Sequence, residues 1–124
     1  MEPTADPRRK FRQAAFTYLH VGLLYEAAVL AAWRADLLPS LRGPVPLWLL
    51  AGAAIVALVF WGLWTGRKWF ARLVWGVHAL RLPALIAGAF FPAADARLPS
   101  SFYIAALLIV VVNLWMLARA GWDL

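Results

Sequence analysis

The sequence predicts an all-α, polytopic membrane protein, built as a bundle of four transmembrane helices with short loops. Two observations predict this class. Apolar side chains make up 65% of the 124 residues and charged side chains only 15%, whereas soluble domains average about 45–50% and ~25%. The apolar residues also gather into four stretches close to the ~20 residues that a helix needs to cross a bilayer.

The predicted spans cover residues 14–33, 46–65, 71–91 and 101–118. They are helices rather than barrel strands, because runs such as residues 53–60 are apolar without the alternation of a barrel strand. Residues 1–13 form a basic tail and residues 119–124 a short one. We therefore expect one helical unit, with no soluble domain between the spans.

Proline and glycine mark the ends of the spans. Pro39 and Pro44 lie between the first two spans and forbid a continuous helix there. Residues 66–68 turn the chain into the third span, and residues 92–99 connect the third span to the fourth. Inside the third span, Pro83 predicts a kink just beyond Arg81. In the second span, Ala53 and Ala57 have the small-residue spacing that lets helices approach closely.

Lysine and arginine residues lie mainly on one side of the predicted membrane. Eight of the 12 are on the side of the two termini, three are in the opposite loops, and Arg81 lies inside a span. The eight are Arg8, Arg9, Lys10, Arg12, Arg67, Lys68, Arg72 and Arg119, and the three are Arg34, Arg42 and Arg97. Since basic residues favour the cytoplasmic side, we expect a bacterial-type inner (plasma) membrane protein with both termini in the cytoplasm. Orientation thus explains the net charge of +6, and no nucleic-acid partner is expected.

A few polar side chains lie within the spans, where a central charge costs about 2.5–3.5 kcal/mol. They are His20, Tyr25 and Glu26 in the first span, His78 and Arg81 in the third, and Asn113 in the fourth. At a rise of ~1.5 Å per residue, Glu26 and Arg81 lie ~18 Å and ~15 Å from the cytoplasmic ends of their spans. His20, His78 and Asn113 lie at ~8–10 Å. The sequence therefore predicts two polar layers.

Glu26 and Arg81 have two interpretations. In the first, the two side chains form a buried ion pair that holds the first span to the third, and the guanidinium binds both oxygens of the carboxylate. Alternatively, Glu26 faces a substrate cavity and takes part in transport. In either case the stripe of Tyr18, Gly22, Tyr25, Glu26 and Val29 should face protein or a cavity rather than lipid.

We expect four side chains to form a polar or ligand-binding layer: His20, His78, Asn113 and Tyr25. Neutral imidazoles on two helices could hold a haem. However, His20 is about 120° away from Glu26 around the first span, so the two cannot face one narrow seam. The chain has no cysteine, and we expect no metal site, no resident cofactor and no catalytic residue.

These features favour a small accessory or interaction subunit without catalytic activity, which acts through its helix faces in a larger membrane complex or homo-oligomer. A second hypothesis is a small proton-coupled transporter of two copies centred on Glu26. The chain resembles the small multidrug transporters in architecture: in its length, its four spans and the glutamate in its first span. The eight-to-three charge bias, however, favours a single orientation. A third hypothesis is a haem- or quinone-holding subunit that uses His20 and His78.

The charge bias predicts that reporters of cytoplasmic location are active when fused after residue 124 and inactive when inserted in the 92–99 loop. Reporters of export should give the reverse result at the same two positions. An exported C-terminus would contradict the predicted orientation.

Overall fold

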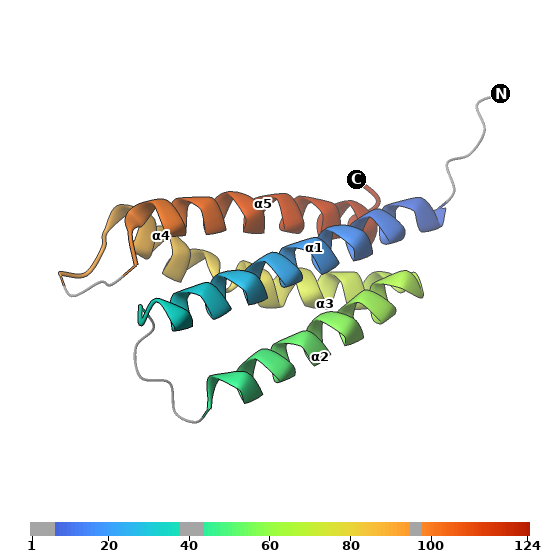
Figure 1. Cartoon of the computed structure of the whole chain (residues 1–124). Coiled ribbons are helices and arrows are strands. Elements are labelled where there is room, and N and C mark those ends of the chain that lie inside the picture. The colour runs from blue at the N-terminus through green and yellow to red at the C-terminus, as the bar shows by residue number, and fades with distance from the viewer. Residues whose placement is uncertain (1–6, 38–43, 95–97) are drawn as a thin grey trace.

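The computed structural model describes residues 7–37, 44–94 and 98–124, which form five helices (Figure 1). These are α1 (Pro7–Arg34), α2 (Val45–Trp64), α3 (Lys68–Ala79), α4 (Leu82–Phe90) and α5 (Ser100–Trp122). Four segments are long and apolar enough to cross a membrane: α1, α2, α3 together with α4, and α5. The predicted class, an all-α bundle with four membrane spans, is confirmed.

The helices extend beyond the apolar stretches. Helix α1 includes most of the basic tail, and α5 continues to Trp122. Of the charges used to predict orientation, Arg42 and Arg97 lie outside the described residues. The first and last helices lie so that α1 begins and α5 ends at the same end of the bundle (Figure 1). We call this the terminal end, and the opposite end, where α1 ends and α5 begins, the loop end.

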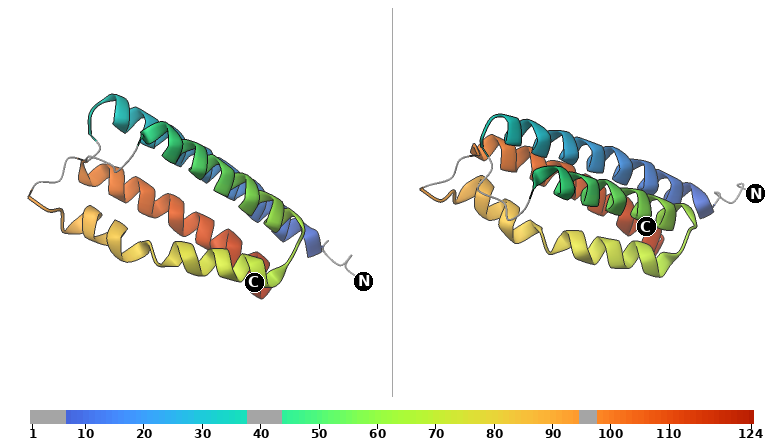
Figure 2. Two further views of the ribbon diagram at one scale, coloured as in Figure 1. Left: turned by 90° about the horizontal axis from the view of Figure 1, so that it is seen from below. Right: turned by 60° about the horizontal axis from the view of Figure 1, so that its bottom comes forward.

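Helix α1 connects two halves of the bundle. It packs along α2 on one side and against α5 on another, while α3 and α4 pack against α5. Two further views show α1 and α2 running together, with α3 and α4 following α5 (Figure 2). Helix α2 has few contacts with α3 and depends mainly on α1.

The third span is broken at Leu80 and Arg81, between α3 and α4. Pro83 lies in the first turn of α4, where its missing N–H group costs nothing. Because proline has no backbone N–H group, Pro83 cannot donate a hydrogen bond to the carbonyl of Ala79, and a continuous helix would lack that bond. The predicted kink is confirmed, and it takes the form of a break that includes Arg81.

The well-packed core lies in the terminal half of the molecule. Leu63 of α2 and Leu117 of α5 are fully buried, surrounded by small side chains that let the helices approach closely. The small residues are Ala14, Ala15, Ala71 and Ala120, all with no exposed surface. Because lipid is as apolar as leucine, close packing rather than exclusion of water stabilises this core.

Polar contacts join the helix ends at the terminal end. Arg72 Nε donates to the carbonyl oxygen of Gly121 at 2.8 Å, and Arg119 Nη1 donates to Gln13 Oε1 at 3.2 Å. Lys68 at the start of α3 forms an ion pair with Asp123, just beyond α5. The hydrogen bond from Lys68 lowers the pKa of the Asp123 carboxyl below its ordinary value. These contacts connect α1, α3 and α5 where the chain leaves the apolar core.

Glycines, rather than the predicted alanines, form the close approach of α1 to α2. A Cβ atom on Gly22 would collide with Val56, and one on Gly52 would overlap the Glu26 carboxylate. Ala53 and Ala57 are exposed, so the proposed small-residue contact at these two positions is wrong. In a helix this rich in alanine, the spacing of small residues does not reveal which face meets the neighbour.

We predict that Leu63→Ala lowers the free energy of unfolding by about 2 kcal/mol or more, because it leaves a cavity in the core. Leu58→Ala on the same helix is the control, since Leu58 is 62% exposed and its loss should change stability by only about 0.5 kcal/mol. Unfolding of both variants and the wild type in one detergent measures the difference. Equal losses for the two variants would contradict the packing described above.

Candidate functional site

A polar cavity of about 190 Å³ lies in the middle of the bundle, between α1, α2 and the break of the third span. Four residues of the stripe predicted on the first span line it, whereas Val29 does not, and the other two segments contribute further residues. The lining residues are Tyr18, Val21, Gly22, Tyr25, Glu26, Gly52, Ile55, Val56, His78 and Arg81. We call this cavity the polar pocket.

Glu26 reaches the polar pocket from α1 and lies against α2. Its carboxylate occupies the space that Gly52 leaves free, because any side chain at position 52 would overlap it. Helix α2 contributes Gly52, Ile55 and Val56 to the pocket and no titratable group. Gly52 therefore leaves the space that the Glu26 carboxylate occupies.

Arg81 reaches the polar pocket from the break between α3 and α4. Its guanidinium lies over the ring of Tyr25, with 5.1 Å from Cζ to the ring centroid. Such a cation–π contact attracts the cation to the face of the ring, and here it holds Arg81 against α1. The Arg81 residue remains exposed, so its guanidinium is available to a molecule in the pocket.

His78 and Tyr18 form a hydrogen-bonded pair at the same cavity. The Tyr18 hydroxyl and His78 Nε2 are 2.8 Å apart, and the two rings meet edge to face with 5.2 Å between centroids. Tyr18 is 6% exposed and belongs to the core of the terminal half. The pair thus lies between the closed core and the polar pocket.

The predicted partners Glu26 and Arg81 face one cavity without direct contact. Among the residues that the structure describes, the salt bridge within 4 Å joins Lys68 to Asp123. The space between Glu26 and Arg81 is the polar pocket itself. Their energetic coupling stays a prediction.

His20 and Asn113 lie elsewhere. The exposed ring of His20 donates through Nδ1 to the carbonyl oxygen of Phe16, one turn earlier on α1, at 2.6 Å. Asn113 of α5 is 1% exposed, and its Oδ1 has no hydrogen-bond partner among the described residues. Neither side chain lines the polar pocket, so the structure brings His78 together with Glu26 and Arg81 rather than with His20.

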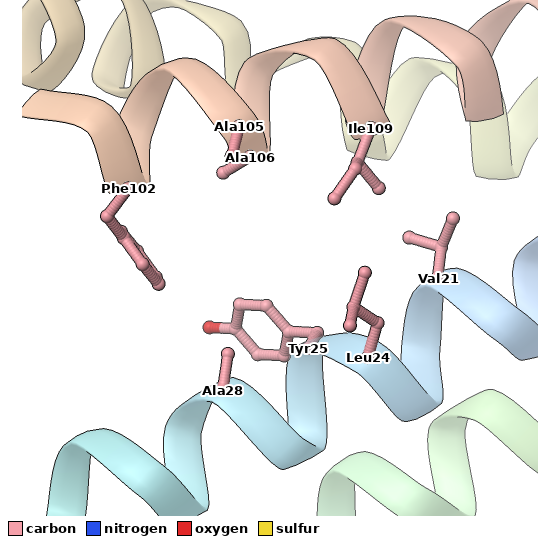
Figure 3. Close-up of a pocket in the computed structure, with 8 residues that line it drawn as sticks. All are labelled: Val21, Leu24, Tyr25, Ala28, Phe102, Ala105, Ala106 and Ile109. Carbon is pink, nitrogen blue, oxygen red and sulfur yellow. The ribbon is translucent and has the colours of Figure 1, made fainter.

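A second cavity of about 260 Å³ lies between α1 and α5. Figure 3 shows Val21, Leu24, Tyr25 and Ala28 of α1 facing Phe102, Ala105, Ala106 and Ile109 of α5. Its lining is almost wholly apolar, and we call it the apolar groove. Val21 and Tyr25 line both cavities, so the groove and the polar pocket are neighbours.

The sequence indicated most of this site but missed Gly52. The stripe on the first span, His78 and Arg81 all carried a chemical signal. Gly52 carried only a weak signal, because it is one of two glycines, with Gly62, in an apolar helix. Its role depends on the contact with Glu26, which the sequence of α2 does not contain.

The fold and the site define a class: a multi-pass, all-α membrane protein with a cavity that charged side chains help to line. Comparison with known proteins adds no family, since no family model, curated protein or solved structure matches the chain. In the described part of the chain there is also no group of three histidine, aspartate or glutamate residues that could hold a metal ion. The arrangement places one anionic and one cationic side chain, Glu26 and Arg81, at the same cavity.

We predict that Glu26 and Arg81 are energetically coupled. Glu26→Gln and Arg81→Met should each destabilise the protein, because each leaves one charge within the membrane without its counter-charge. The double variant should recover about 0.5–3 kcal/mol relative to the sum of the single losses. Unfolding free energies of the four proteins in one detergent provide this test. Losses that add within about 0.3 kcal/mol would show that the two side chains act independently.

Proposed function

We propose that the chain is a small proton-coupled transporter of the bacterial-type inner membrane, with both termini in the cytoplasm, and that it works without catalytic chemistry. The observation that supports this proposal is the position of Glu26, an ionisable side chain within a span that lines a cavity with Arg81 and His78. Ionisable residues inside a membrane usually face such cavities and mark proton or substrate pathways.

The uneven packing of the bundle supports access from one side. The terminal half is closed around Leu63 and Leu117, and its helix ends are joined by polar contacts. The described residues that line the two cavities lie mainly nearer the loop end. A solute in the polar pocket is therefore separated from the terminal end by the core, as in one of the two states that alternating access requires.

Proton coupling follows from the charge of Glu26. A carboxylate holds a cationic group of the solute, whereas a protonated carboxyl no longer does. A proton and the solute therefore compete for one side chain. A pair of chains, as in the homo-oligomer expected from the sequence, would supply further helix surface around the cavity.

Proteoliposomes containing the pure protein and a trapped pH-sensitive dye test the proposal. Adding solutes from a panel of small anions, cations and zwitterions should change the internal pH for at least one of them. Glu26→Gln should reduce this flux to the level of protein-free liposomes. No solute-dependent proton flux in the wild type would contradict the proposal.

Gly52→Ala provides a sharper variant, because it retains both charges and fills the space of the carboxylate. We expect it to lower the flux strongly. Gly76→Ala is its matched control, since a Cβ at position 76 meets no atom within 4 Å. Equal flux in the two variants would show that the polar pocket is not the pathway.

The accessory-subunit role is a second proposal, which the exposed His20 on α1 favours. A polar ring at ~9 Å depth on the exposed face of α1 gains from a partner helix. The transport experiment separates the two proposals, because an accessory subunit reconstituted alone gives no solute-dependent proton flux.

A further inference from the structure

We infer that the polar pocket binds a small zwitterion, with its carboxylate on Arg81 and its ammonium group on Glu26. This inference rests on the proposed transport function and names the chemical class of its solute. It starts from the two opposite charges that face one cavity while a separate contact holds each in place.

The two charges are held apart by different helices. Glu26 lies in the space that Gly52 of α2 leaves free, and Arg81, within the break in the third span, lies over the ring of Tyr25. A direct salt bridge would satisfy both groups without any ligand. Since the described residues show no such bridge between them, each charge still faces the cavity and can take a counter-charge from a molecule inside it.

Charge balance favours a molecule that carries both signs. A lone anion would neutralise Arg81 and leave the Glu26 carboxylate without a counter-charge inside the membrane, where isolated charges are costly. A lone cation would do the opposite. A zwitterion neutralises both side chains and leaves the net charge of the pocket unchanged.

The size and lining of the cavity limit the solute. A volume of about 190 Å³ equals about six water molecules at ~30 Å³ each, which corresponds to a molecule of few non-hydrogen atoms. Val21, Ile55 and Val56 give part of the lining an aliphatic surface. A small α-amino acid, with two charged groups on one carbon and a short aliphatic side chain, has this combination.

Protonation of Glu26 would release this solute. The ionisable groups facing the carboxylate are Tyr18 and Tyr25 of α1, His78 of α3 and Arg81 at the break, and α2 contributes none. When a proton binds the carboxylate, the ammonium group loses its counter-charge and Arg81 still carries its own. The zwitterion then leaves as the proton enters, which is the exchange that the proposed function requires.

Binding of three probes of similar size to the purified full-length protein tests the inference. L-alanine carries both charges, propionate lacks the ammonium group, and ethylammonium lacks the carboxylate. We expect calorimetry to give at least about tenfold tighter binding of alanine than of either other probe, since each charge-assisted contact contributes about that factor or more.

Variants assign the two ends of the ligand. Glu26→Gln should reduce the affinity for alanine to that for propionate, and Arg81→Gln should reduce it to that for ethylammonium. Asp36→Asn and Arg34→Gln change the same charge types at exposed positions of the chain and should leave binding unchanged. The comparison of probes on the wild type does not depend on any variant folding.

The outcomes separate the inference from the function. Equal affinity for alanine and propionate, or for alanine and ethylammonium, would overturn the zwitterion while proton-coupled flux of another solute would still support transport. Absence of alanine binding together with such flux would overturn only the solute class. Absence of both binding and flux would overturn both proposals.

Discussion

The cost of placing a charge inside a membrane governs the architecture of this bundle. Glu26 and Arg81 lie within predominantly apolar spans, and neither could face lipid without a large penalty. The helices keep both side chains at one cavity, to which α1, α2 and the broken third span all contribute. Among the described residues, the close-packed core cluster lies in the terminal half and not at the level of these two charges.

Small residues have opposite consequences in the two halves. In the terminal half, Ala14, Ala15, Ala71 and Ala120 bring the helices together around two leucines. In the middle of the bundle, Gly52 does not fill space but leaves it to the Glu26 carboxylate. The same lack of side-chain volume therefore produces a core at one level and a site for a charge at another. The position of a small residue relative to the neighbouring helix decides whether it produces a core or a site for a charge.

The sequence predicted the number of spans, the kink at Pro83 and the inward-facing stripe of the first span, because each depends on local hydropathy, backbone chemistry or helical phase. It did not predict that His78 would join Tyr18 and the charged pocket rather than His20 and Asn113. The depth of a residue along its helix gives its level in the membrane, but not the direction in which its side chain points around the helix axis. The relation between Gly52 and Glu26 was also out of reach, since it is a contact between two helices whose rotation only the fold determines.

The position of Tyr25 between two cavities has a mechanical consequence. Its ring borders the apolar groove and also supports the Arg81 guanidinium. A rotation of this one side chain would therefore change the lining of the apolar groove and of the polar pocket together. The same rotation would free the guanidinium from the ring. The lining of both cavities and the position of the arginine are therefore linked through a single side chain.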